Sequence, residues 1–384
     1  MISNRAKAIS PSLTLGISAK VKQMKAEGQN VINLSIGAKE GAIYAIENNL
    51  TKYDVASGNK ELKEAIVAKL KKDNGLDYKV SQIVVTSGAK HAITNALLAT
   101  VNPDEEVIIP HPYWVSYPEM VSIVGGKPII LKTDIETGYK LTLEALKEQV
   151  TDKTKMVIIT NPSNPTGNVY TTEELQPICE YLAERDIYIL ADEIYERIVY
   201  DEEFTSIPSL SEKIKEMTIL IGGVAKSHSM TGWRIGYTAT NEELASAMGK
   251  IQSHLTSHPS TVSMQAARFA LEKCDADVEK MKETYKERRD MIIDFFKDVP
   301  EIGIVPPRGA FYVFLDISKL EGKLPGDSLS MAFCDRMLDK GIALVPGIGF
   351  GEDHGVRLSY AASLDDIKTG LEKIKELVDE IKNN

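Results

Sequence analysis

Residues 156–195 read MVIITNPSNPTGNVYTTEELQPICEYLAERDIYILADEIY. Two apolar runs, Met156–Thr160 and Ile187–Ala191, flank a helical pattern at Glu173–Glu184. Neither run alternates between apolar and polar residues. This indicates strands that are buried on both faces, as in a mostly parallel sheet covered by helices.

The same alternation extends in both directions from this segment. A further helical pattern lies at Lys90–Thr100. Five more β-rich runs lie at Ile83–Thr86, Val107–Pro110, Pro128–Lys132, Thr218–Ile221 and Arg234–Thr240. Runs and helices in alternation are typical of the α/β class. We predict a mixed, mostly parallel seven-stranded sheet between helices.

The C-terminal part of the chain has a different pattern, which predicts a smaller α+β domain. It starts with a long charged helix at Val278–Lys297. Strand-like and helical segments follow at Gly309–Asp316, Ser328–Lys340, Ala343–Val345, Val356–Ser359 and Leu364–Ile381. The apolar run Val31–Ser35 has no place in the central alternation, so the N-terminus is expected to join this domain. We predict a large domain at 40–285 and a small one from 1–39 and 286–384.

Composition limits the class of partner. The chain has 384 residues, a net charge of −10 and a pI of about 5.3, and such a surface repels nucleic acid and anionic membranes. It has neither a membrane-length apolar run nor the pattern of a signal peptide. The three cysteines, Cys179, Cys274 and Cys334, lack metal-ligand spacing. We expect a cytoplasmic protein without a metal, and an anionic substrate would need local basic residues.

A lysine follows a Gly-Gly turn in residues 218–237, TILIGGVAKSHSMTGWRIGY. Lys226 stands among small residues, and Arg234 comes eight residues later. Taken alone, such a lysine is more often a solvated loop residue. A desolvated lysine near other cations, however, has a depressed pKa and can attack a carbonyl. Arg234 could hold a phosphate by a charge-assisted fork.

Polar residues also follow the two runs first quoted. Asp192 either caps a following helix or pairs with a protonated pyridine nitrogen, and Tyr195 could donate a hydrogen bond. TNPSNPTG is either a surface turn or a rigid segment that aims the Asn164 amide.

Two further motifs are weaker. Ser-Gly-Ala at 87–89 opens a helix whose free N–H groups would suit a phosphate. Arg357, on a short apolar run, needs a carboxylate partner that is either structural or a substrate.

Together these segments resemble the class I/II aminotransferases, fold type I enzymes that use pyridoxal 5′-phosphate (PLP), and in particular the bacterial-type aspartate aminotransferase branch. The resemblance spans nearly the whole chain. Its most specific pieces are SIG, TKYDVASG, PYWVSYPEM, NPSNPTG, ADEIYE, AKSHSMTGWRIGY and GVRLSY, in family order. It implies the PLP-dependent transferase fold and amino transfer between an amino acid and a 2-oxo acid by a ping-pong mechanism.

The resemblance implies a role for each matched residue. Lys226 would hold the cofactor as a Schiff base and later move a proton, and Asp192 would pair with the pyridine nitrogen. Tyr195 and Asn164 would bind the phenolic oxygen, and Trp114 would stack on the ring. Arg357, helped by the backbone near Gly37, would bind the substrate α-carboxylate. The phosphate would be bound by Gly88, Ala89, Arg234 and, from the partner subunit of a homodimer, Tyr53.

Substrate choice is implied in the same way. Lys90 resembles the residue that reads the distal carboxylate of aspartate or glutamate, and Ser12 and Thr14 match hydroxyl positions contributed by the other subunit. An ammonium with two hydroxyl donors suits a second carboxylate. Alternatives are an aromatic or prephenate aminotransferase, which Lys90 does not exclude, and a PLP-dependent C–S lyase, which it disfavours. A DNA-binding regulator on this fold would need a basic module that the chain has no room for.

The chain departs from the family pattern at two places. Gly223 stands where some relatives have a phosphate-binding serine. The family motif SIGEPDF-D-TP also precedes a helix, whereas here a helical pattern begins directly after Gly37. Either the chain truly lacks about ten residues of the family pattern at this point, or it carries further residues between the positions numbered 37 and 38. We favour the second explanation, which predicts a Cα separation across this bond well above the ~3.8 Å of a trans peptide.

Overall fold

The computed structural model describes residues 3, 7, 9–10 and 36–382. In this part of the chain, seven strands form one sheet in the order β1-β7-β6-β5-β4-β2-β3. The strands are β1 (Ile83–Thr86), β2 (Glu106–Pro110), β3 (Lys127–Leu131), β4 (Thr154–Thr160), β5 (Tyr188–Asp192), β6 (Thr218–Gly223) and β7 (Gly236–Ala239). Only β7 runs antiparallel to its neighbours, β1 and β6. The predicted mixed, mostly parallel sheet is confirmed, and each of the seven runs predicted for it overlaps one of its strands.

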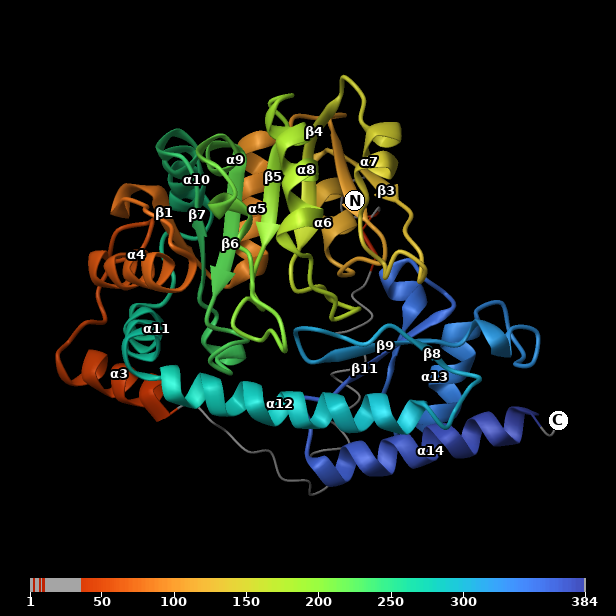
Figure 1. Cartoon of the computed structure of the whole chain (residues 1–384). Helices are drawn as coiled ribbons and strands as arrows, with labels where there is room; N and C mark the ends of the chain where they lie inside the picture. The colour runs from red at the N-terminus through yellow and green to blue at the C-terminus, as the bar shows by residue number, and fades with distance from the viewer. Residues whose placement is uncertain (1–2, 4–6, 8, 11–35, 383–384) are drawn as a thin grey trace.

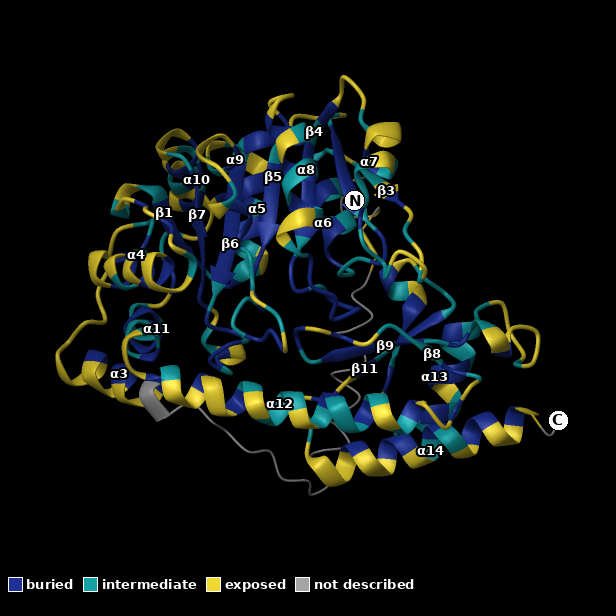
Figure 2. Cartoon of the chain, in the orientation of Figure 1, coloured by how far each residue is buried: buried dark blue, intermediate teal, exposed yellow. Residues whose placement is uncertain are grey.

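Helices cover both faces of this sheet (Figure 1). One face packs on α4 (Lys60–Asn74), α7 (Leu143–Gln149), α8 (Thr172–Ala183), α9 (Glu212–Met217) and α11 (Thr261–Lys273). The other packs on α5 (Ala89–Thr100), α6 (Tyr117–Val124) and α10 (Glu242–Leu255). Successive strand residues enter opposite cores: Ile189 and Ala191 lie in one, and Leu190 in the other. This two-sided burial explains why the central strands β4, β5 and β6 are largely apolar, and Figure 2 shows them as mostly buried.

A second, antiparallel sheet has the order β10-β11-β9-β8. Its strands are β8 (Gly303–Ile304), β9 (Tyr312–Asp316), β10 (Val345–Pro346) and β11 (Gly355–Ser359). It shares a core with α12 (Asp275–Phe296), α13 (Leu329–Asp339) and α14 (Leu364–Lys382), and α12 and α14 run side by side in Figure 1. These elements match the predicted α+β pattern. The boundary predicted between residues 285 and 286 falls inside α12, and the division into domains stays a prediction.

Helix α3 corrects the expectation about Gly37. It runs from Ile36 to Glu47 without interruption, so Gly37 and Ala38 are successive residues of one helix. The prediction that further residues lie between Gly37 and Ala38 is therefore wrong. The physical reason is local: Ala38 and Ala42 are buried, and a Cβ at Gly41 would lie 2.6 Å from the Gln265 carbonyl oxygen of α11. Small residues therefore let α3 pack closely on α11. The predicted strand Val31–Ser35 lies outside the described residues.

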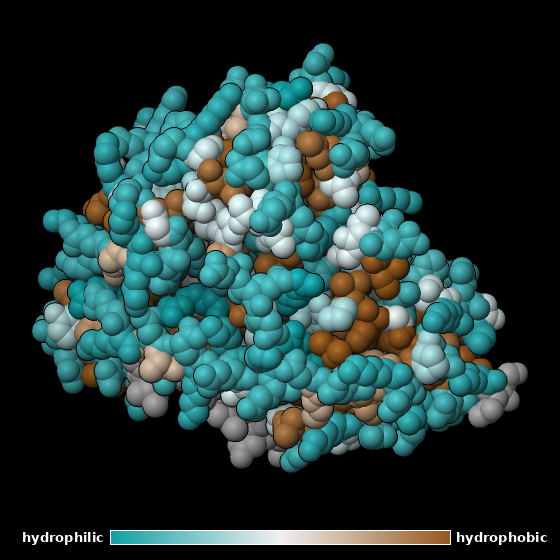
Figure 3. All heavy atoms as spheres, viewed as in Figure 1, coloured by the Kyte–Doolittle hydropathy of each residue, from teal (hydrophilic) through white to brown (hydrophobic). Residues whose placement is uncertain are grey.

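The surface is mainly hydrophilic. Hydrophilic side chains cover most of the face in Figure 3, and apolar ones gather mainly over β8 and β9. Within the described residues, no helix is both long enough and apolar enough to cross a bilayer.

Candidate active site

A pocket of about 280 Å³ opens where the two sheets meet. β4 ends at Thr160 and β5 ends at Asp192, so both contribute from their carboxyl ends, where open α/β sheets bind ligands. Tyr312 of β9 and Arg357 of β11 reach the pocket from the second sheet. Nine residues predicted from the sequence line it: Ala89, Lys90, Trp114, Asn164, Asp192, Tyr195, Lys226, Arg234 and Arg357.

Asp192 is a buried carboxylate at the floor of the pocket. Its Oδ2 accepts a hydrogen bond from the Tyr117 hydroxyl (2.6 Å), and its Oδ1 accepts one from the Ile194 N–H (3.3 Å). Burial raises the pKa of Asp192, and these hydrogen bonds and the charge of Lys226 oppose the rise. No helix follows Asp192, because residues 194–197 form a turn. The helix-cap alternative is therefore wrong.

The neighbouring carboxylate, Glu193, has a different role. It accepts hydrogen bonds from the Ser206 hydroxyl (2.6 Å) and the Ile207 N–H (2.8 Å). Burial raises the pKa of Glu193 to about 8. These bonds tie residues 206–207 to the end of β5, so Glu193 is a structural residue and Asp192 alone faces the pocket.

Lys226 lies in the turn after β6 and is partly buried. Its Nζ is 5.7 Å from the centre of the Tyr195 ring and 5.8 Å from the centre of the Phe311 ring. Within the described residues, Nζ forms neither a hydrogen bond nor an ion pair. A lysine that aromatic rings hold in a pocket without a fixed partner is available to react with a ligand.

Close backbone packing shapes an anion site beside Lys226. Gly88 precedes α5, whose first N–H groups lack partners within the helix. A Cβ at Gly88 would lie 2.6 Å from Nη2 of Arg234, and a Cβ at Gly236 would lie 2.5 Å from the Ala89 nitrogen. Arg234 adopts a left-handed backbone (φ 57°) that brings its guanidinium to this helix start. A helix N-terminus together with a guanidinium suits a phosphate.

Gly223 fits the crowding at the end of β6. A Cβ there would lie 3.0 Å from both the Ile194 side chain and the Ile235 carbonyl oxygen. Glycine at this position therefore avoids a close contact with both neighbours.

Arg357 enters the pocket from the opposite side. Its Nη1 donates a hydrogen bond to Oδ1 of Asn164 (2.8 Å). Its guanidinium lies against the rings of Tyr312 (4.4 Å) and Phe350 (4.9 Å). Its Nε is buried without a hydrogen-bond partner, and no carboxylate of the described residues pairs with it. A half-buried guanidinium whose Nε donor is unused suits a ligand carboxylate.

Lys90 is a second cation in the pocket. Its Nζ donates a hydrogen bond to the Ser116 hydroxyl (2.9 Å) and lies 4.9 Å from the centre of the Trp114 ring. Burial, and then the charge of Arg234, lowers the pKa of Lys90. An incoming carboxylate would favour the charged ammonium.

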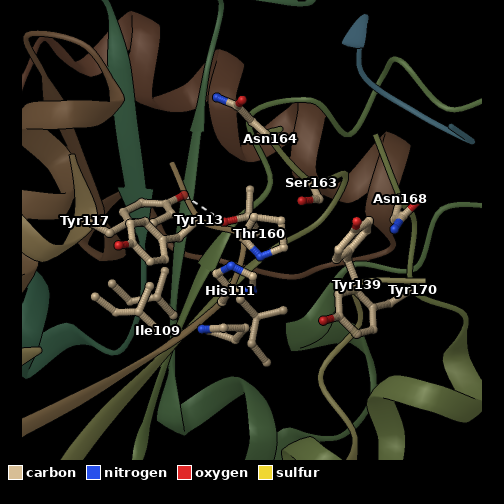
Figure 4. A pocket seen from close by; sticks show the side chains of 14 residues that line it. Ile109, His111, Tyr113, Tyr117, Tyr139, Thr160, Ser163, Asn164, Asn168 and Tyr170 are labelled. Carbon is tan, nitrogen blue, oxygen red and sulfur yellow. Dashed lines mark hydrogen bonds between the residues drawn. The ribbon is translucent and has the colours of Figure 1, made fainter. Parts of the chain in front are cut away.

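A small cavity of about 20 Å³ lies next to the pocket (Figure 4). The two share Tyr117, Thr160 and Asn164. The Tyr117 hydroxyl is 2.7 Å from Oγ1 of Thr160, the dashed contact in Figure 4, and also donates to Asp192. Tyr117 and Thr160 therefore hold Asp192 in place.

Some predicted site residues lie elsewhere. Tyr53 is 94% exposed and does not line this pocket. Gly37 lies in the first turn of α3, and its backbone role stays a prediction. Ser12 and Thr14 lie outside the described residues.

Sequence reasoning assigned no role to Tyr117, Thr160 or Tyr312, which line the pocket. Tyr117 lies inside the motif PYWVSYPEM and Thr160 inside TNPSNPTG, so the sequence indicated these segments but not the roles of the two residues. Tyr312 had no local signal, because its neighbours in the pocket come from distant segments.

The chain belongs to the aminotransferase class I and II family, whose model matches residues 23–374. It is 43% identical to the aspartate aminotransferase of Bacillus sp. (strain YM-2), over 98% of this chain and 99% of the relative. It is 38% identical to the aspartate/prephenate aminotransferase of Nitrosomonas europaea, over 98% and 99% of the two chains. Among solved structures, it is similar to the aspartate aminotransferase of Thermus thermophilus with maleate (TM-score 0.91, 34% identity, 98% and 99% covered).

Enzymes of this family depend on PLP, and the pocket fits that cofactor. The close packing at Gly88 and Gly236 brings the Arg234 guanidinium and the first N–H groups of α5 together in a cradle that suits a phosphate. Asp192 is a buried carboxylate that would suit the pyridine nitrogen, and a protonated nitrogen there would favour its ionised form. Lys226 would supply the amine.

The glycine cradle can be tested by Gly88→Ala. The added Cβ would displace the Arg234 guanidinium and would strain a backbone with φ +85°. We expect PLP affinity to fall by roughly tenfold or more, measured by fluorescence titration of the apoenzyme.

Gly75→Ala is the matched control, since Gly75 also has a positive φ (+69°) but nothing lies within 4 Å of an added Cβ. Equal PLP affinity in the two variants would contradict the cradle.

Proposed function

We propose that this protein is a PLP-dependent aminotransferase that moves the amino group between aspartate or glutamate and a 2-oxo acid. The observation that carries the proposal is that two cations, Arg357 and Lys90, line the same pocket as Lys226. A dicarboxylic amino acid offers one carboxylate to each cation and its amine to the site of Lys226. The names of the relatives agree with this substrate class.

The residues divide the work of holding the cofactor. Arg234 and the α5 N-terminus would bind the phosphate, Asp192 would hold a proton on the ring nitrogen, and Trp114 would cover a ring face. Tyr195 and Asn164 would face the phenolic oxygen. When bound, the cofactor supplies the carbonyl that receives the amino group and an electron-poor ring that takes up electrons from the substrate carbon.

The remaining residues act on the substrate. Arg357 would bind the α-carboxylate, and its contact with Asn164 fixes the guanidinium plane. Once displaced by the substrate amine, Lys226 Nζ would remove the proton from the substrate Cα and deliver it to the cofactor carbon that receives the amino group. A second 2-oxo acid would reverse these steps, so the kinetics should be ping-pong.

Lys90→Ala tests the substrate class. We expect kcat/KM for aspartate and glutamate to fall by roughly 10- to 100-fold, the size of a partly buried charge-assisted contact. Phenylalanine should change little, because it has no distal carboxylate. The measurement is the half-reaction rate with each amino acid.

Lys79→Ala, an exposed lysine that pairs with Glu242, serves as control. An equal loss on acidic and aromatic substrates would mean that Lys90 only supports the pocket structure.

A second candidate is an aspartate/prephenate aminotransferase, which the Nitrosomonas europaea relative favours by its name. The large Trp114 ring beside Lys90 could face an aromatic or a prephenate side chain as well as a carboxylate. Half-reactions with prephenate and with phenylalanine decide between a narrow and a broad range. A C–S lyase has no use for Lys90 and would release ammonia.

We further propose a two-fold homodimer with shared active sites, in the cytoplasm. The apolar side chains exposed on α3 and after it and at the end of α10 are Ile43, Tyr44, Ile46, Leu50, Tyr53, Val55 and Leu255. Tyr53 lies edge-on to His258, which follows α10, with 5.9 Å between ring centres. Exposed apolar residues of this kind support a protein interface. The buried thiols of Cys179 and Cys334 support a reducing compartment.

Shared sites predict complementation between inactive chains. Tyr53→Ala and Lys226→Ala homodimers should each have low activity. A refolded equal mixture should recover roughly a quarter of wild-type activity, because half the dimers are hybrids with one native site.

Analytical ultracentrifugation should show a dimer throughout. An active monomer, or no recovery in a mixture that contains hybrid dimers, would refute shared sites.

A further inference from the structure

We propose that Tyr312 is a positioning residue that couples the cofactor side of the pocket to the substrate-carboxylate side. The inference deepens the proposed function and rests on it. Tyr312 belongs to β9 of the four-stranded sheet, whereas Tyr195 follows β5 of the seven-stranded sheet. The two hydroxyl oxygens are 2.9 Å apart and buried. One tyrosine thus joins the two sheets inside the pocket.

The direction of this hydrogen bond follows from the number of protons. A phenol has one O–H to donate and lone pairs that accept. If Tyr195 donates its proton to a ligand oxygen, Tyr312 must be the donor between the two tyrosines. Within the described residues, the Tyr312 hydroxyl has no other hydrogen-bond partner. Donation from Tyr312 polarises the Tyr195 hydroxyl and strengthens its own donation.

The ring of Tyr312 makes a second, independent contact. The Arg357 guanidinium lies over it, 4.4 Å from the ring centre. The same guanidinium lies 4.9 Å from the centre of the Phe350 ring. A cation over an aromatic face is attracted by the ring quadrupole. β9 and β11 are neighbouring antiparallel strands, and Arg357 pairs with Phe314, two residues along β9 from Tyr312. The ring and the guanidinium are therefore diagonal neighbours on one face of the small sheet. Tyr312 therefore uses its hydroxyl on Tyr195 and its ring on Arg357.

Two substitutions separate these contacts in the holoenzyme. Tyr312→Phe removes the hydroxyl and keeps the ring. Tyr312→Leu removes both. Tyr360→Phe is the matched control: its hydroxyl is also buried and donates to the Ala310 carbonyl (3.2 Å), but it does not line the pocket. The two readouts are the pH midpoint of the visible absorbance of the bound cofactor and the dissociation constant of maleate.

We expect Tyr312→Phe to raise the pH midpoint by roughly half a unit, the scale of one modest hydrogen bond. Weaker donation from Tyr195 leaves more negative charge on the phenolic oxygen of the cofactor. This charge stabilises the protonated form of a neighbouring basic group, so that group loses its proton at a higher pH. Maleate affinity in Tyr312→Phe should stay within about twofold of wild type, because the ring remains under Arg357. Tyr312→Leu should show the same midpoint shift and a roughly five- to tenfold weaker maleate affinity.

A midpoint in Tyr312→Phe equal to that of Tyr360→Phe overturns the hydroxyl role. Wild-type maleate affinity in a folded Tyr312→Leu overturns the ring role. If Tyr312→Leu does not fold, Tyr312→Phe alone decides the proposal, because the coupling requires the midpoint shift. A wild-type protein that binds neither PLP nor maleate would refute the proposed function instead, so the two failures are distinguishable.

Discussion

Lys226→Ala is expected to lower amino transfer by roughly a millionfold, the scale found when a residue of covalent catalysis is removed. The fold should persist, because Nζ of Lys226 forms no hydrogen bond or ion pair within the described residues. PLP should still bind through the phosphate cradle and Asp192. The visible absorbance band that arises from the bond between PLP and Lys226 should, however, be missing. Borohydride reduction of wild type, followed by peptide mass spectrometry, should fix the cofactor to the peptide that contains Lys226.

Lys226→Arg is the control for charge. It keeps a cation near Asp192 but lacks an amine that can exchange with a substrate. Both variants should be inactive, and activity in Lys226→Arg would show that only the charge matters. Borohydride labelling of another lysine would move the assignment elsewhere.

Asp192→Ala is expected to lower kcat by roughly a thousandfold, as when a charge partner of a transition state is removed. Burial raises the pKa of Asp192, so a protonated ring nitrogen would be the partner that keeps the carboxylate ionised. Without the carboxylate, the nitrogen loses its proton and the ring takes up electrons poorly. Single-turnover absorbance measures the loss directly.

Asp192→Asn separates charge from structure. Its amide oxygen can still accept the Tyr117 hydrogen bond, but it carries no charge. We expect a loss nearly as large as in Asp192→Ala. Near-normal turnover of Asp192→Asn would show that the residue serves only as an acceptor for Tyr117.

The sequence predicted the large sheet well for a physical reason. Strands buried on both faces must be continuously apolar, so β4 and β5 can be recognised from the sequence alone. Their carboxyl ends then located Asp192 and Asn164. The predicted run Arg234–Thr240 was less accurate, because β7 begins only at Gly236. Arg234 leaves the strand in a left-handed conformation, which its place beside Gly88 explains.

Long-range partners were beyond prediction from local pattern. Tyr117 and Asp192 are 75 residues apart, and Tyr195 and Tyr312 are 117 apart. No spacing rule brings such hydroxyls together. The error at Gly37 has the opposite origin: the family pattern was given more weight than the local sequence, in which alanine and glutamate favour a helix directly.

The central claim, amino transfer from a dicarboxylic amino acid, is tested most directly by a half-reaction. Purified holoenzyme is mixed with excess aspartate and no 2-oxo acid, and the released products are counted. We predict one oxaloacetate per subunit, no ammonia, and no further product until a 2-oxo acid is added. Continuous release of ammonia, or no oxaloacetate from an enzyme saturated with PLP, would contradict the account.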